Sequence, residues 1–293
     1  MEVKKIAVIG AGLMGSGIAQ VAATAKYDVM MTDMTEERIS KALDSISWSL
    51  KKFAEKGKIT EPADAVFARI QTATGPEAAA DADLVIEAVF EKVEVKLELL
   101  GELDGICRPG AVIASNTSTI PITLLSKALG NPEKCIGMHF FSPVPMMTLL
   151  EIIPTERTSQ DTLDTALEVG QAMGKNTIVV KKDIPGFLMN RIFGQMVCEA
   201  VRLVESGAGS VEDIDTGMCQ GFAMRMGPLA IADLAGLDIS LHAFSNIHDL
   251  DPEGIPAPPE LLKRLVSEGK LGRKSGEGFY RDDEKGKNLG AAM

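Results

Sequence analysis

The sequence predicts an α/β fold, a doubly wound and mostly parallel sheet followed by a smaller all-α domain. Short β-branched segments alternate with helical segments as far as Val180, a pattern typical of a parallel sheet covered by helices on both faces. Beyond Val180 helical patterns continue without strands to about residue 270. The length of 293 residues suits roughly two domains. We therefore expect one domain at residues 1–184 and a second at 185–293.

Composition excludes several classes of protein. The chain has 41 acidic and 30 basic residues and a formal net charge of −11, so a nucleic-acid partner is not expected. No apolar run is long enough to cross a membrane. The 4 cysteines lack metal-ligand spacing and are expected to be reduced thiols, with no metal site. These features favour a soluble, cytoplasmic protein in which any anionic ligand must be bound locally.

The predicted strands are β-branched runs bounded by Gly, Asp or Asn. They are Lys5–Ile9, Val29–Thr32, Leu84–Val89, Val112–Ala114, Cys135–His139, Leu149–Ile153 and Thr177–Val180. Ser159 and Ser210 are predicted to cap the starts of two helices. We expect Pro185 to begin the first helix of the second domain. That helix is apolar over a wide arc, which indicates a central helix or a subunit interface.

A glycine-rich turn joins the first strand to the first helix. The first glycine of a GxGxxG allows a tight turn, the second lets the backbone approach a pyrophosphate, and the third lets helix and strand pack closely. The N–H groups at the helix start can then bind phosphates without a basic patch. The predicted cofactor-binding residues of this turn are Gly10, Gly12, Leu13, Met14 and Gly15.

Asp33 closes the second strand, about 20 residues beyond the last glycine of the turn. A carboxylate there can accept hydrogen bonds from the adenosine ribose, and it would repel a 2′-phosphate. The sequence therefore favours NAD over NADP. The alternative, a glycine-rich turn followed by a surface Asp, has to explain strand, glycines, helix and acid as coincidence.

Among the histidines, His139 is the candidate acid/base group, because it ends a strand and Glu151 follows 12 residues later within an apolar strand. A buried carboxylate needs a partner, and an imidazole supplies one. The carboxylate would fix the tautomer and stabilise the imidazolium. A structural histidine and a solvent-exposed glutamate are the alternatives.

Two further polar groups flank predicted elements. Ser115–Ser118 follows a strand, where its hydroxyls could bind substrate or form an ordinary turn or cap. Asn190 lies near the predicted domain junction, where its amide could orient substrate or only bond backbone.

These motifs, in this order, resemble the short-chain L-3-hydroxyacyl-CoA dehydrogenase family, and most of all the bacterial 3-hydroxybutyryl-CoA dehydrogenases. The matching segments are 9–20, 115–118, 138–143, 185–191, 226–229 and 272–280, which together span nearly the whole chain. The resemblance implies a Rossmann-like NAD domain, an acyl-CoA substrate and a homodimer formed through the helical C-terminal domain. It implies hydride transfer between NAD(H) and an (S)-3-hydroxyacyl-CoA, yielding a 3-oxoacyl-CoA such as acetoacetyl-CoA.

Roles follow from the resemblance position by position. His139 would be the general base, Glu151 its orienting partner, and Ser118 and Asn190 would hold the substrate oxygens. The further cofactor-contacting positions would be Glu91, Lys96, Asn116, Ser118 and Ser142. Ser142 is a departure, because the family usually has Asn there, near the nicotinamide.

The resemblance assigns CoA contacts to Ser49, Lys52, Lys56 and Ser118. The lysine run at 51–58 is explained about equally well as a solvated helix face, although a basic cluster suits the CoA phosphates in so acidic a chain. Two alternative functions stay open: a sugar-acid dehydrogenase of the L-gulonate type, and a catalytically silent, crystallin-like structural protein. The lysine run argues against the first, and the set Ser118, His139, Glu151 and Asn190 against the second.

Overall fold

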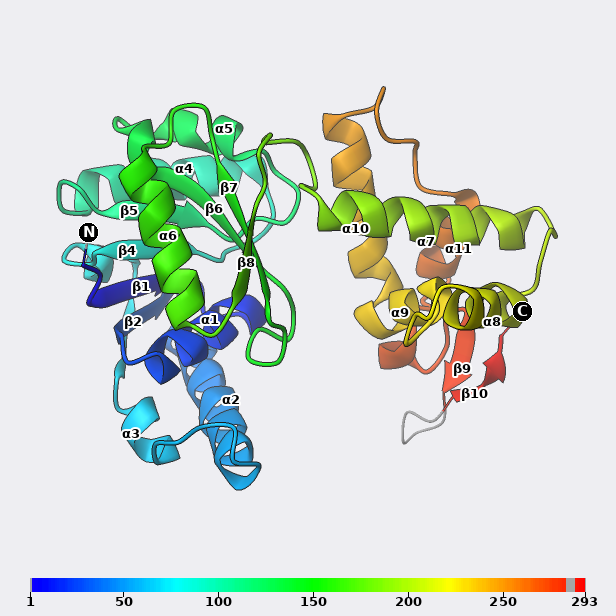
Figure 1. The fold of residues 1–293 in the computed structure, drawn as a ribbon, viewed down its shortest axis with the longest axis horizontal. Helices are drawn as coiled ribbons and strands as arrows, with labels where there is room; N and C mark the ends of the chain where they lie inside the picture. Colours follow the sequence, from blue (N-terminus) through cyan, green and yellow to red (C-terminus); the bar gives the residue numbers. More distant parts are fainter. Residues whose placement is uncertain (1, 283–287, 293) are drawn as a thin grey trace. The chain divides into compact units, whose positions relative to one another are not determined.

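The computed structural model describes residues 2–282 and 288–292. It divides into two compact units, Met1–Ile184 and Pro185–Met293 (Figure 1). The elements of the first unit are β1 (Lys5–Ile9), α1 (Leu13–Thr24), β2 (Asp28–Asp33), α2 (Glu36–Glu55), α3 (Ala63–Phe67), β3 (Ile70–Thr74), β4 (Leu84–Glu87), α4 (Val93–Ile106), β5 (Val112–Ser115), α5 (Ile122–Leu125), β6 (Cys135–Phe140), β7 (Leu149–Pro154), α6 (Gln160–Ala172) and β8 (Asn176–Val179). Short 3-10 turns lie at Pro76–Ala79, Ser126–Ala128 and Pro132–Lys134.

An 8-stranded sheet with the order β3-β2-β1-β4-β5-β6-β7-β8 forms the first unit. All neighbours pair in parallel except β6 and β7, so the sheet is doubly wound and mostly parallel, which confirms the predicted fold class. The strand order reverses between β1 and β4, and ligands of such sheets bind beyond the carboxyl ends of the strands at this switch point. Figure 1 shows α6 in front of the sheet and α4 and α5 behind it.

The core of the first unit is built from the apolar faces that the strand and helix patterns predict. One cluster joins β1, β2 and β4 to the inner faces of α1, α2 and α6, through residues such as Ile18, Ile46 and Val169. In α2, the buried Ile39, Ala42, Ile46 and Leu50 leave the opposite face to charged residues.

The second unit is helical. It contains α7 (Met189–Glu205), α8 (Val211–Gly221), α9 (Pro228–Ala235), α10 (Leu237–Leu250), α11 (Glu260–Ser267), a 3-10 turn at Arg273–Ser275, and the strands β9 (Tyr280–Asp282) and β10 (Asn288–Ala291). The two strands pair as a short antiparallel ribbon that the sequence patterns do not predict. The second unit has a hydrophobic core of its own, in which Val197, Val201 and Phe244 pack with the apolar face of α11.

Local signals succeeded at some boundaries and failed at others. Ser159 and Ser210 cap α6 and α8 as expected, each accepting a hydrogen bond from the third N–H of its helix. Pro185 does not begin α7, which starts at Met189. The chain instead turns through positive φ at Gly186 (75°) and Phe187 (48°), which a helix cannot accommodate.

Candidate active site

The glycine turn between β1 and α1 is built as a nucleotide cradle. Gly10 has φ 109°, and a Cβ there would lie 2.5 Å from the Ala88 carbonyl oxygen. A Cβ on Gly15 would lie 1.7 Å from the Gly10 carbonyl oxygen, so both positions require glycine. A Cβ on Gly12 would meet nothing within 4 Å, which leaves its backbone open to an approaching ligand. Gly12 is also the N-cap of α1 and makes no side-chain capping bond.

Asp33 ends β2 beside this turn. Its Oδ2 accepts a hydrogen bond from the Ala11 N–H at 2.8 Å, and its Oδ1 accepts one from the Met34 N–H at 2.7 Å. The carboxylate is therefore fixed against the backbone of the glycine-rich turn, at the place where this kind of turn binds an adenosine ribose. The open face of Gly12, the start of α1 and Asp33 together fit a dinucleotide such as NAD.

His139 and Glu151 face each other across the antiparallel pair β6–β7. The register places them directly opposite, and Nδ1 of His139 lies 2.7 Å from Oε2 of Glu151. His139 is 5% exposed and Glu151 is fully buried, so each satisfies a polar group that would be costly alone. A carboxylate on Nδ1 directs the imidazole so that Nε2 can exchange a proton with a substrate. This arrangement suits general acid/base chemistry.

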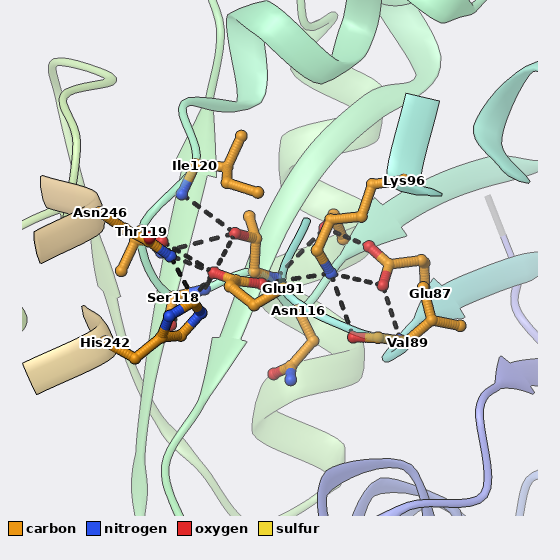
Figure 2. Close-up of polar contacts among 12 residues, drawn as sticks. Glu87, Val89, Glu91, Lys96, Asn116, Ser118, Thr119, Ile120, His242 and Asn246 are labelled. Carbon is orange, nitrogen blue, oxygen red and sulfur yellow. Dashed lines mark hydrogen bonds and ion pairs between the residues drawn. The ribbon is translucent and has the colours of Figure 1, made fainter. Parts of the chain in front are cut away.

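The Glu91 side chain accepts several hydrogen bonds from the loop that follows β5. Its Oε1 accepts the Ser118 N–H at 2.8 Å, the Thr117 hydroxyl at 2.6 Å and the Thr119 N–H at 3.0 Å. The Ser118 hydroxyl also donates to this oxygen, at 3.1 Å. Figure 2 shows Glu91 lying beside Ser118 and Thr119. One oxygen of the Glu91 carboxylate thus accepts hydrogen bonds from three successive residues of the turn that contains Ser118.

Lys96 lies between two carboxylates. Its Nζ is 2.6 Å from Oε1 of Glu87 and 3.3 Å from Oε2 of Glu91 (Figure 2). The Lys96 side chain is 1% exposed and that of Glu87 is fully buried. Glu87 also accepts hydrogen bonds from the Ser115 hydroxyl at 2.6 Å and the Val89 N–H at 2.7 Å. We call these four residues, Glu87, Glu91, Lys96 and Ser115, the buried ion cluster.

The ion cluster keeps Glu91 ionised. Burial alone would raise the pKa of Glu91, but the Lys96 ammonium and the hydrogen bonds from Thr117, Ser118 and Thr119 outweigh it and lower that pKa below its usual value. Lys96 is buried and its ammonium contacts Glu87 and Glu91. Its expected contact with NAD stays a prediction. Asn116 is also engaged internally, since its Oδ1 accepts the Phe140 N–H at 2.9 Å and ties this loop to β6.

Glu87 and Thr119 belong to this site but were not among the residues predicted from the sequence, and Thr117 was included only as a member of the Ser115–Ser118 segment. Glu87 carries the same signal as Glu151, a carboxylate within an apolar strand, and the need of a buried charge for a partner could have found it. Lys96 follows on the next helix, at a spacing that only the fold explains. Thr117 and Thr119 give no signal beyond that of an ordinary turn.

The remaining predicted residues lie in three places. Ser142 is exposed in the loop between β6 and β7, whose Val144 and Met147 carbonyls accept hydrogen bonds from the buried Lys175 ammonium at 2.6 and 2.7 Å. Ser49 and Lys52 lie on α2, and Lys56 is its C-cap. Asn190 lies at the start of α7, in the second unit.

Two kinds of feature are missing from the described part of the chain. Among residues 2–282 and 288–292, no three His, Cys, Asp or Glu side chains gather as a metal site would require. Within the same residues, no helix combines the length and apolarity needed to cross a bilayer.

Comparison with known proteins identifies the family. Residues 5–184 match the model of the 3-hydroxyacyl-CoA dehydrogenase NAD binding domain, and residues 186–282 match the model of the C-terminal domain of the same family. A probable 3-hydroxybutyryl-CoA dehydrogenase from Deinococcus radiodurans is 43% identical over 277 residues, covering 94% of this chain and 99% of that one. The mitochondrial hydroxyacyl-coenzyme A dehydrogenase of Homo sapiens is 41% identical over 287 residues, covering 95% of this chain and 91% of that protein.

A solved structure is similar over the same extent. The (S)-3-hydroxybutyryl-CoA dehydrogenase PaaH1 from Ralstonia eutropha superposes with a TM-score of 0.91 at 37% identity, covering 97% of this chain and all of that one. The chain belongs to the 3-hydroxyacyl-CoA dehydrogenase family, with the NAD-binding domain of that family followed by its C-terminal domain.

Proposed function

We propose that the chain interconverts (S)-3-hydroxyacyl-CoA and 3-oxoacyl-CoA with NAD(H), and that 3-hydroxybutyryl-CoA and acetoacetyl-CoA are its substrates. The contact between His139 and Glu151 carries this proposal, because it supplies a buried, oriented acid/base group at the carboxyl edge of an NAD-binding sheet. Bound NAD supplies the hydride acceptor. The relatives named for 3-hydroxybutyryl-CoA support the short acyl chain.

His139 moves the proton in this proposal. In oxidation, Nε2 of His139 takes the proton of the C3 hydroxyl while C3 loses its hydride, and Glu151 stabilises the imidazolium through Nδ1. In reduction, the imidazolium returns the proton to the C3 oxygen. Ser118 and Asn190 hold the substrate oxygens. Glu91 holds Ser118 through its N–H and its hydroxyl hydrogen, and the Ser118 oxygen can accept a hydrogen bond from the C3 hydroxyl.

Substitution of His139 by Gln tests the mechanism. Gln keeps a polar side chain but cannot exchange a proton near neutral pH, so kcat for acetoacetyl-CoA reduction should fall about 10²- to 10⁴-fold. Binding of NADH, followed by its fluorescence, should stay within about threefold of the parent. Turnover of the variant near that of the parent would contradict the role of His139.

A substrate panel separates the three functions that the sequence left open. Acetoacetyl-CoA, acyl-chain homologues up to C16 and a sugar acid are each offered with the matching cofactor form, and NADH absorbance is followed. We expect turnover only of the CoA thioesters. Oxidation of the sugar acid alone would favour the alternative dehydrogenase, and no turnover of any substrate would favour the silent structural protein.

The lysine segment of α2 is proposed to bind CoA through Ser49, Lys52 and Lys56. Trp48 gives a direct test, because it is the only tryptophan of the chain and is 66% exposed on the same helix. Addition of CoA should change its fluorescence, and Lys52→Gln together with Lys56→Gln should weaken CoA binding about tenfold at low salt. Unchanged CoA affinity would favour a solvated helix face.

Assembly and location complete the proposal. A homodimer through the helical second unit is supported by large apolar side chains that are exposed there, such as Ile192 (65%) and Ile239 (57%). Light scattering on a sizing column measures the mass, and a monomer of 31.2 kDa would contradict the dimer. A cytoplasmic location is proposed from the sequence, while the human relative is named as mitochondrial.

A further inference from the structure

Arg38 lies beside the carboxylate expected to bind the adenosine ribose. It stands in the first turn of α2, where its N–H donates to the Thr35 hydroxyl. Its Nη1 is 3.5 Å from Oδ1 of Asp33. The Asp33 side chain is 7% exposed and that of Arg38 is 51% exposed, so the guanidinium lies on the solvent side of the pair.

The other contacts of Asp33 show which one a cofactor would displace. The carboxylate already accepts the Ala11 N–H at 2.8 Å and the Met34 N–H at 2.7 Å. The contact with Arg38 is the longest of the three at 3.5 Å, and its guanidinium is half-exposed to water, so it is the weakest. A ribose hydroxyl that reaches Asp33 would therefore displace Arg38 and leave the backbone contacts in place.

Phe90 gives the displaced guanidinium a second partner. The Arg38 guanidinium carbon lies 5.3 Å from the centroid of the Phe90 ring, within cation–π range. Phe90 is 64% exposed in the loop after β4, at the switch point of the sheet. Arg38 therefore connects the end of β2 with the end of β4, at the carboxyl edge of the sheet where ligands of this fold bind.

We propose that Arg38 determines how strictly this dehydrogenase prefers NAD over NADP. Asp33 repels a ribose 2′-phosphate and also neutralises the Arg38 guanidinium, which could bind that phosphate. An arginine at this place can accept a 2′-phosphate through two parallel hydrogen bonds. Removing the charge of Asp33 releases Arg38 for that contact, so a gain in NADPH binding depends on Arg38 and not only on lost repulsion.

A binding cycle tests this dependence without requiring turnover. Dissociation constants for NADPH and NADH are measured by nucleotide fluorescence on the parent, Asp33→Asn, Arg38→Gln and the double variant. Asp33→Asn should bind NADPH at least about tenfold more tightly than the parent, and the double variant should lose most of that gain. Affinity of Arg38→Gln for NADH should stay within about threefold of the parent.

Lys41 offers a matched control. It stands one turn further along α2, carries the same charge and pairs with Glu37 at 2.6 Å. Asp33→Asn combined with Lys41→Gln should keep the NADPH gain, and Asp33→Asn combined with Phe90→Ala should keep only part of it. The proposal is overturned if Asp33→Asn shows no gain, if the Arg38 double variant keeps it, or if the Lys41 control loses it equally. Because only cofactor binding is read, these outcomes are independent of the acyl-CoA assay.

Discussion

The two units bury their carboxylates in different ways. In the first unit, Glu151 faces a histidine, and Glu87 and Glu91 share the Lys96 ammonium. In the second unit, Asp215 accepts the N–H groups of Leu229 and Ala230 and the Tyr280 hydroxyl. Asp233 accepts the N–H groups of Phe279 and Tyr280.

The consequence is visible in the pKa values. Burial raises the pKa of Asp233 to about 6. The N–H contacts from Tyr280 and Phe279 oppose this rise, and the nearby negative charges of Asp282 and Asp215 add to it. The pKa of Glu91 is lowered instead, where a buried cation and five hydrogen bonds oppose the effect of burial. Carboxylates beside the proposed chemistry are balanced by cationic or ionisable partners, whereas those of the second unit connect backbone segments.

Removing the cation should have the largest effect on stability. Lys96→Met leaves Glu87 and Glu91 without their buried counter-ion, so the free energy of unfolding should fall by about 3–5 kcal/mol. Urea denaturation measures it. Lys52→Met is the matched control, because Lys52 is 44% exposed and pairs only with Glu55, and its cost should be within about 0.5 kcal/mol. A loss below about 1 kcal/mol for Lys96→Met would show that the ion cluster is not charge-balanced as described.

Asp233 should make the stability of the second unit depend on pH in the sense opposite to that expected for a carboxylate whose pKa is lowered, such as Glu91. A raised pKa means that the folded protein holds this proton more tightly than the unfolded chain. Its contribution to the free energy of unfolding therefore decreases as pH rises from about 4 to about 6, by up to about 3 kcal/mol, and is level above. The difference in unfolding free energy between the parent and Asp233→Asn, measured across this range, should show that slope. A difference that does not vary with pH would refute it.

Glu151→Gln should sharpen the contrast at the proposed catalytic pair. Gln can still accept a hydrogen bond from Nδ1 of His139 but does not stabilise the imidazolium by charge, so kcat should fall about 10²-fold. The KM for NADH should change little. Steady-state kinetics with acetoacetyl-CoA measure both, and a change in KM alone would indicate that the pair only maintains structure.

Tyr280→Phe should have the smallest effect. The substitution removes the 3.0 Å hydrogen bond to Asp215, which keeps its two backbone partners, so the cost should be about 1–2 kcal/mol. Thermal unfolding measures it. A cost similar to that of Lys96→Met would erase the distinction between the two kinds of buried carboxylate.

The central strands of the sheet could be predicted from the sequence because they are short, continuous runs of apolar and β-branched residues. Sequence reasoning missed β3, because Ile70–Thr74 has only one large apolar side chain among polar and small ones and pairs with β2 alone, at the edge of the sheet. His139 and Glu151 could be paired because a buried charge needs a partner and the two lie close in sequence. Glu87 and Lys96 obey the same rule, yet the strand end and helix turn that join them are defined only by the fold. Arg38 and Phe90 are 52 residues apart and carry no local signal at all.

The reversal of direction at β7 has a consequence for how this site can be altered. The proposed catalytic pair is encoded by one uninterrupted stretch, Cys135–Pro154, whereas the cofactor cradle draws on β1, β2 and β4. A slip of one residue in the β6–β7 register would place the two side chains on opposite faces of the sheet. The acid/base function could thus be inherited or transplanted as one hairpin, provided that its register is retained, while cofactor preference can be changed separately at the ends of β2 and β4.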